Sequence, residues 1–277
     1  CLQRRKPVHD IVKTTYLHVI GDTHIGSTTA LSPLRYTLHN RNTLEAQEVK
    51  ANKLQRWLYE CWEDFWDYVD TKSKKRRLIV AHLGDVVDGV HHNSTQLVAE
   101  VGDQVEMAIE MLSPIREKAD TFIGILGTAV HAGQDHATEA AIYKALNADH
   151  VGQSITANID GMIVDFAHHG RTGSRPWTTG APALAAEIML DYAQSGMELP
   201  NLIFIGHRHV LQDSGAHFEN TRLIQCPSFQ LKTSHGWNVA GNTVRSDIGG
   251  VLVIDGEVDL SRSRYRGQPD QRKVLMI

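Results

Sequence analysis

Five short apolar segments of the chain each end in polar side chains suited to chemistry. Residues 15–20 run into the sequence GDTH, and residues 78–83 run into GDVVDG. The segments at 121–126, 162–167 and 202–205 end in GTAVH, HHG and GHRH. Apolar runs of this length bounded by glycine predict buried strands. Because ligands collect outside the carboxyl ends of strands in open α/β sheets, strands lying side by side would bring these polar groups to one rim.

Helical patterns separate the predicted strands. Apolar residues recur at steps of three and four between Asn42 and Val69, and further helices are predicted at 95–119, 138–146 and 183–194. Pro114 is expected to bend or end the second helix, and Pro182 suits the first turn of the last. The alternation of strand and helix indicates crossover units with strands buried on both faces.

The predicted fold class is α/β, a two-sheet β-sandwich flanked by helices. We expect a single domain over residues 1–277, with a helical insertion at about 30–75. A strand-rich C-terminal part at about 210–277 is expected to complete the second sheet. A chain of 277 residues is long enough to bury a sizeable core.

The composition of the chain limits which binding partners and which cellular compartment are expected. The net charge is −4, so no overall basic field indicates nucleic acid or membrane, although a local cationic groove is compatible with this total. No apolar run approaches the roughly 20 residues of a membrane helix, so no membrane association is expected. Three cysteines without metal-type spacing indicate a reducing compartment, and we expect a cytoplasmic protein. The oligomeric state is open.

The strand ends carry carboxylates, imidazoles and one hydroxyl. These are Asp22, His24, Asp85, Asp88, Thr128, His131, His168, His169, His207 and His209. Carboxylates and imidazoles without thiolates suit Mn²⁺, Fe or Zn²⁺ better than Ca²⁺. One carboxylate shared by two ions about 3.5–4 Å apart makes a two-metal site for acyl or phosphoryl hydrolysis. Each motif alone is weak evidence for a metal site. Their occurrence in this order in one chain predicts a metal centre.

The order GDTH, GDVVDG, a glycine-led histidine motif, a strand-end histidine and GHRH resembles the calcineurin-like metallophosphoesterase family, between residues 17 and 210. The resemblance implies a β-sandwich flanked by helices. It implies hydrolysis of phosphate mono- or diesters by a hydroxide that bridges two divalent metal ions. Mn²⁺ is the first expectation for the metal, with Fe, Zn²⁺, Ni²⁺ and Mg²⁺ as alternatives.

The resemblance also implies roles for individual residues. Asp22, His24 and His209 would bind one metal, and Asp85 would bridge both. His207 would bind the second metal together with either His168 or His169, of which His168 is slightly preferred. Asp88, counted among the catalytic residues, would orient a neighbouring histidine or support a ligand.

The third motif departs from the family pattern. The family has Gly-Asn-His, with the asparagine on the second metal, whereas this chain has Thr128 and places His131 two positions later. Either His131 supplies the missing ligand, or it protonates the leaving group and the second metal is held more loosely. A few phage-borne members of the family look similar, with GTxxH.

Candidate substrate contacts lie on two loops. His91, His92 and Asn93 are interpreted as a substrate wall or as a polar loop before a helix. Arg171 and Arg175 are candidates to bind phosphate in two-point geometry. The sequence QDHATE at 134–139 is interpreted as a helix cap in preference to an outer support of the metals.

Two other functions are retained as alternatives. The basic run KSKKRR at 72–77 and the arginine loop keep a DNA nuclease of the same fold as an alternative, and nucleic acid as a partner besides the phosphate ester. The lost asparagine keeps a degenerate metal-binding module without turnover as another.

Overall fold

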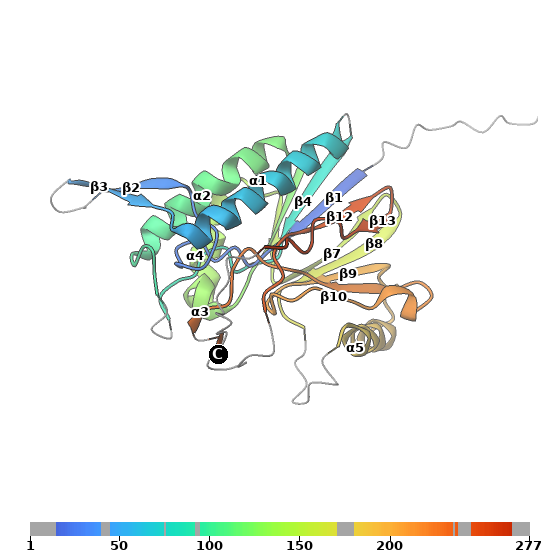
Figure 1. Cartoon of the computed structure of the whole chain (residues 1–277). Coiled ribbons are helices and arrows are strands. Elements are labelled where there is room, and N and C mark those ends of the chain that lie inside the picture. The colour runs from blue at the N-terminus through green and yellow to red at the C-terminus, as the bar shows by residue number, and fades with distance from the viewer. Residues whose placement is uncertain are drawn as a thin grey trace, which may run out of the picture.

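Two stacked β-sheets form the centre of the molecule, with helices on both outer sides (Figure 1). The computed structural model describes residues 15–39, 45–74, 76–91, 95–170, 180–234, 236–237 and 245–267. The expected α/β fold, a two-sheet sandwich flanked by helices, is confirmed. Among the described residues, no helix combines the length and apolarity needed to cross a bilayer.

The first sheet has six strands in the order β13-β12-β1-β4-β5-β6. β1, β4, β5 and β6 are parallel, β12 pairs antiparallel with β1, and β13 pairs antiparallel with β12. Their bounds are β1 Thr15–Ile20, β4 Arg77–His82, β5 Thr121–Ile125, β6 His150–Gly152, β12 Val251–Ile254 and β13 Glu257–Asp259. Three of the predicted strands therefore lie side by side here, with their carboxyl ends on one edge.

The second sheet has five strands in the order β10-β11-β9-β8-β7. The bounds are β7 Ser154–Ile159, β8 Met162–Ala167, β9 Leu202–Ile205, β10 Gln212–Asp213 and β11 Arg222–Gln225. The picture of five chemistry-bearing strands side by side was therefore wrong, because β8 and β9 belong to this sheet. The chain passes from the first sheet to the second between β6 and β7, which residue 153 alone separates. A turn at Asp160 and Gly161, with φ of 53° and 90°, then joins antiparallel β7 and β8.

The apolar core has three layers. α1 (Lys53–Ser73), α2 (Val101–Lys118) and α4 (Ala137–Ala145) pack on the outer face of the six-stranded sheet, where Phe65 and Phe122 are fully buried. Between the sheets, Val19 of β1 packs in one cluster with Phe166 and Phe204 of the second sheet. α5 (Ala181–Gln194) covers the other face of the five-stranded sheet. Burial on both faces explains the nearly unbroken apolar runs of the strands.

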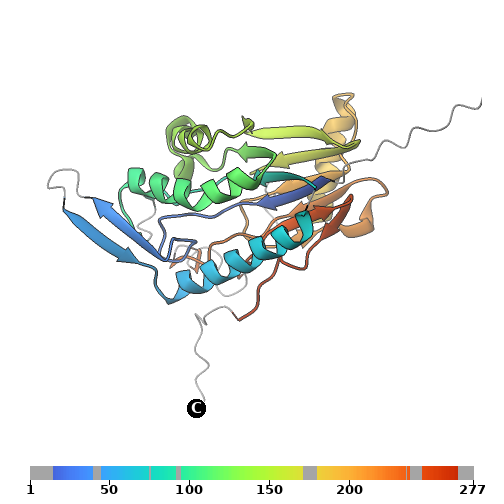
Figure 2. The same ribbon diagram turned by 90° about the horizontal axis from the view of Figure 1, so that it is seen from above.

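The predicted insertion is only partly helical. β2 (Arg35–His39) and β3 (Ala46–Lys50) form a hairpin that projects from the body (Figures 1 and 2). The helix therefore begins at Lys53 rather than at Asn42, because the Asn52 side chain accepts hydrogen bonds from the amides of Leu54 and Gln55.

Other helix bounds also differ from expectation. α2 begins at Val101 instead of residue 95 and continues past Pro114 to Lys118, with Ile115 buried against the core. Pro182 lies in the first turn of α5, as expected. Short helices α3 (Ala129–Ala132), η1 (Gln134–His136) and η3 (Gly215–His217) lie in the loops.

A buried histidine in β1 predicts a pH-dependent stability. The His18 ring is fully buried near Trp66, and neither ring nitrogen hydrogen-bonds to a described residue. Burial lowers its pKa to about 3. An unfolded histidine takes up a proton below its pKa of about 6.5, whereas the folded one stays neutral. The free energy of unfolding therefore falls by about 1.4 kcal/mol for each unit that the pH drops below about 6.5, until the pH reaches the native pKa.

We expect His18→Leu to remove this dependence. Between pH 7 and pH 5 the parent chain should lose about 2 kcal/mol more stability than the variant. Urea unfolding at both pH values measures the difference, in which other titrating groups such as His82 cancel. Equal losses in the two proteins would show that His18 does not titrate on unfolding.

Candidate metal centre

The polar strand ends converge although they come from two sheets. β1, β4 and β5 reach the site from the six-stranded sheet, and β8 and β9 reach it from the five-stranded sheet. The loops after β1 and β4 run together, since the amide of Asp22 donates to Gly84 O and the amide of His24 to Asp85 O. The side chains predicted from separate motifs are thus neighbours.

The backbone is strained at this point. Asp22, His24, Asp85, His207 and His209 all have positive φ, between 43° and 72°. Such a conformation costs about 1–3 kcal/mol for a residue other than glycine and persists where the surroundings enforce it. Five strained residues in five of the predicted ligand positions indicate that the loops are shaped to aim these side chains.

A first donor set consists of Asp22, His24 and His209, whose ligand atoms lie within 4.8 Å of one another. His209 Nε2 is 3.2 Å from both Asp22 Oδ1 and His24 Nε2. Asp22 is fully buried, and its carboxylate also accepts from the amide of His207. Two imidazoles and a carboxylate at this spacing are suited to a divalent cation.

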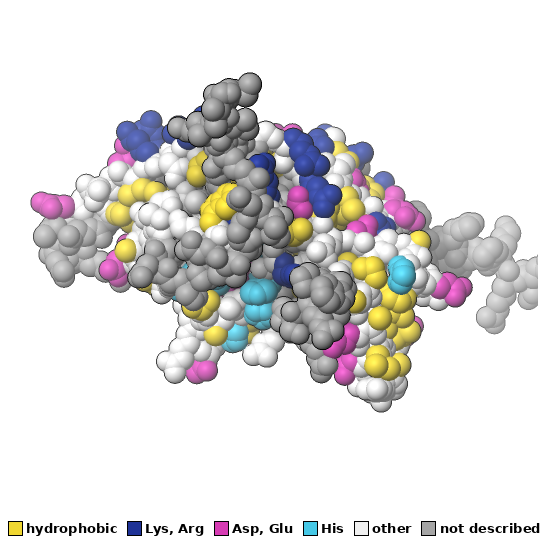
Figure 3. Space-filling model, turned by 60° about the horizontal axis from the view of Figure 1, so that its bottom comes forward, with side chains coloured by type: hydrophobic (Ala, Val, Ile, Leu, Met, Phe, Trp, Pro, Cys, Tyr) yellow, Lys and Arg dark blue, Asp and Glu magenta, His cyan; other side chains and the backbone are white. Residues whose placement is uncertain are grey.

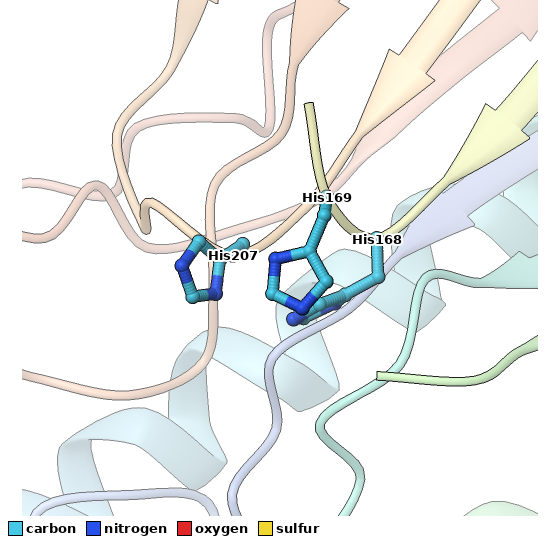
Figure 4. A group of neighbouring side chains, drawn as sticks. All are labelled: His168, His169 and His207. Atoms are coloured by element: carbon cyan, nitrogen blue, oxygen red, sulfur yellow. The ribbon is translucent and has the colours of Figure 1, made fainter. Parts of the chain in front are cut away.

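A second donor set consists of His168, His169 and His207, which also lie within 4.8 Å of one another. Figure 4 shows the three rings gathered where β8 and β9 end. His168 Nδ1 donates to Leu83 O at 2.6 Å, because the carbonyl can only accept. This bond leaves the Nε2 lone pair of His168 directed at the site, as in histidines that bind metals.

Asp85 lies between the two donor sets. Its Oδ2 is 3.0 Å from His168 Nε2 and 3.8 Å from His24 Nε2, and its Oδ1 accepts from the amide of Thr128. Its exposed fraction is 1%. A carboxylate between two donor sets could bridge two cations, which is the role that the resemblance implied for Asp85.

The buried charges shift one another's pKa. Burial lowers the pKa of His24, but the nearby carboxylates of Asp22, Asp88 and Asp85 reverse this and bring it to about 10. The pKa of His168 rises to about 9 despite burial, because of the Asp85 charge. Burial alone would raise the pKa of Asp85, but the neighbouring histidines hold it below its usual range. The site thus keeps its carboxylates ionised and attracts positive charge.

Asp88 supports the first donor set instead of entering it. Its Oδ1 is 3.4 Å from His24 Nδ1 and accepts from Gln230, while its Oδ2 accepts from Gln96 at 2.6 Å. A carboxylate behind an imidazole orients the ring and raises its basicity. The resemblance implied this orienting role. Neither glutamine was predicted: Gln96 follows Asp88 by eight residues, and Gln230 comes from a distant part of the chain.

Glu139 links the loops that follow β4 and β5 through hydrogen bonds. This fully buried carboxylate accepts from the amides of Val86 and Gly127, which adjoin Asp85 and Thr128. Burial raises its pKa to about 7, and the nearby Asp85 charge adds to the effect. The interpretation of Glu139 as a helix cap was wrong, since its side chain leaves α4 and bonds to the loops after β4 and β5.

His131 reaches the site from the short helix α3. Its Nδ1 donates to Asp88 O at 2.6 Å, so Nε2 faces Asp85 Oδ2 at 4.0 Å. Its ring packs edge-on against His24 and His91, with centroids 4.5 Å and 4.2 Å away. The His131 ring therefore lies beside the first donor set, and the His91 ring packs against the His131 ring.

A cavity of about 360 Å³ opens beside the donors. His91, predicted as a substrate contact, lines it, whereas His92, Asn93, Arg171 and Arg175 lie outside the described residues. Arg208 and Lys232 line it too and were missed by the sequence reasoning. Histidine side chains reach the surface near the middle of this face (Figure 3).

Comparisons with known proteins add little. No family model and no curated protein matches the chain. An archaeal phosphodiesterase is similar in structure at 11% identity and TM-score 0.40, over 91% of this chain and 97% of its own. A zinc complex of Vps29 from Entamoeba histolytica is similar at 14% identity and TM-score 0.41, over 88% of each chain. A hypothetical protein from Pyrococcus horikoshii reaches TM-score 0.48 at 8% identity, over 88% of this chain and 86% of its own. At these scores the likenesses support no argument about function.

Proposed function

We propose that the protein is a phosphoesterase that depends on two divalent metal ions. One observation carries the proposal: two sets of ligand atoms, drawn from the strand ends of both sheets, lie on either side of the buried carboxylate of Asp85. The donors fit such ions, because oxygen and imidazole nitrogen without thiolate suit Mn²⁺, Fe or Zn²⁺. Two bound cations would neutralise phosphate charge and lower the pKa of water toward 7.

The chain supplies the remaining functions. Asp88 and Leu83 O hold His24 and His168 in orientation through their Nδ1 atoms. His131 carries a proton on Nδ1 and presents Nε2 to the site, from where it can exchange a proton with a leaving group. The cations Arg208 and Lys232 line the cavity, and guanidinium and ammonium groups bind phosphate oxygens.

The nuclease alternative loses part of its support. The described residues of the basic run, 72–74 and 76–77, lie at the end of α1 and the start of β4, whereas Asp85 follows the other end of this strand. Arg76 pairs with Asp255, and Arg77 lies 3.6 Å from Asp160. A basic run that is distant from the centre and partly neutralised does not extend its binding surface, so we favour a small phosphate mono- or diester over DNA.

Hydrolysis of chromogenic esters tests the proposal. The purified chain, stripped with a chelator, is reloaded in turn with Mn²⁺, Zn²⁺, Ni²⁺ and Mg²⁺. We expect release of nitrophenolate from bis-(p-nitrophenyl) phosphate or p-nitrophenyl phosphate only after reloading. The reason is that, in the proposed mechanism, the cations stabilise the negative charge that develops on the phosphate. Release that survives complete metal removal, or no release with any metal, would overturn it. The second result would favour a binding module without turnover.

A further inference from the structure

Thr128 leaves the second donor set short of a strong ligand. Its hydroxyl lies 3.2 Å from Asp85 Oδ2, where the resembling family has an asparagine amide. A neutral hydroxyl is a weaker donor to a divalent ion than an amide oxygen or an imidazole nitrogen. A cation held by Asp85, His168 and His207 would therefore profit from a further ligand.

His169 is placed to be that ligand. Its Nε2 lies 3.3 Å from Thr128 Oγ1, as does Nδ1 of His207, while Nε2 of His168 lies 3.1 Å away. Metal–ligand bonds of about 2.0–2.2 Å place neighbouring ligand atoms about 3–3.5 Å apart. Each of the three nitrogens thus lies at such a distance from Thr128 Oγ1, and all three lie within 4.8 Å of one another, so they can gather around one cation.

The alternative ligand, His131, lies on the other side. It groups with His24 and Asp85, and separately with Asp88 and His91, but not with His168, His169 or His207 among the described residues. The bond from His131 Nδ1 to Asp88 O also fixes its ring beside the first donor set. His131 is therefore poorly placed to replace the asparagine.

We propose that His169 compensates for the missing asparagine, so that His168, His169 and His207 bind the second cation together with Asp85. This inference rests on the proposed two-metal function. It replaces the choice between His168 and His169 with a site that uses both. Three imidazoles and one carboxylate favour Zn²⁺, Ni²⁺ or Fe²⁺ over the hard Mg²⁺. The second site should therefore be more selective against Mg²⁺ than the first, which has more carboxylate oxygen.

Metal binding without substrate tests this inference. Chelator-stripped chain is titrated with Zn²⁺, and bound metal is counted by elemental analysis after dialysis. Co²⁺ is added in a parallel series, because its visible absorption reports the number and kind of ligands. We expect two ions per chain in the parent protein and in His150→Ala, which removes an exposed histidine of β6. In His169→Ala one of the two binding constants should fall by roughly a hundredfold or more, since loss of a group that only supports a ligand already costs about 10–100-fold.

Two further variants make the test specific. In the double variant Thr128→Asn/His169→Ala, the amide should restore most of the lost affinity, with an altered Co²⁺ spectrum. His131→Ala should keep two ions. Loss of the second ion in His131→Ala, or an unchanged affinity in His169→Ala, would overturn the inference and leave the two-metal function standing. A parent chain that binds fewer than two ions would instead contradict the proposed function itself.

Discussion

We expect Asp85→Asn to abolish metal binding at both donor sets and to lower kcat/KM by roughly a thousandfold or more, because in the proposed two-metal centre one carboxylate serves both cations. The substitution keeps the size of the side chain. It removes the negative charge that faces His24 and His168, and the neutral amide that replaces it is a weaker ligand for a divalent cation. Bound metal and steady-state kinetics with the chromogenic diester measure the two effects.

The control for Asp85→Asn is Asp191→Asn, which neutralises an exposed carboxylate of α5. Circular dichroism and urea unfolding establish that both variants are folded. If Asp85→Asn retained two ions and parental kcat/KM, Asp85 would not bridge the cations and the assignment of the centre would be wrong.

Gly127→Ala is expected to disrupt the same centre through the backbone. A Cβ at residue 127 would clash with both the amide nitrogen and Oδ1 of Asp85, so the loops after β4 and β5 would have to separate. The shift would also strain the hydrogen bond from the Gly127 amide to Glu139. Overpacking of this kind costs about 1–3 kcal/mol, and we expect the second cation to be lost with it.

Gly180→Ala is the matched control for the added methyl group. A Cβ added at residue 180 would have Pro182 Cδ as its nearest heavy atom, at 3.8 Å, which is an ordinary van der Waals contact. Urea unfolding and metal counting are carried out on both alanine variants. Unchanged stability and metal content in Gly127→Ala would mean that the close approach of the two loops is not required.

Local sequence was enough to find the donors but not their arrangement. The bounds of β1, β8 and β9 were predicted correctly, because a buried apolar run that ends at glycine or histidine is a local signal. The sheet that each strand joins depends on distant pairing, so the transfer of β8 and β9 to the second sheet was not visible. The Asp160-Gly161 turn was a signal that could have indicated the β7–β8 hairpin.

Supporting residues were the hardest to predict. Glu139 and Gln230 resemble ordinary polar residues of a helix and a loop, and their roles arise from contacts with Val86, Gly127 and Asp88. Such contacts join residues far apart in the chain, and no spacing rule relates them. The hairpin β2–β3 was missed although β2, RYTLH, alternates polar and apolar residues, because its partner β3, AQEVK, is largely exposed and lacks this alternation.

The position of the centre between two sheets has a consequence for unfolding. Asp22 and Asp85 follow strands of one sheet, while His168 and His207 follow strands of the other. Cations held by all four act as a cross-link between the layers, and binding that favours the folded chain raises the midpoint of denaturation with metal concentration. The stripped protein should then be able to melt one layer before the other, whereas the loaded protein should melt as a single cooperative unit.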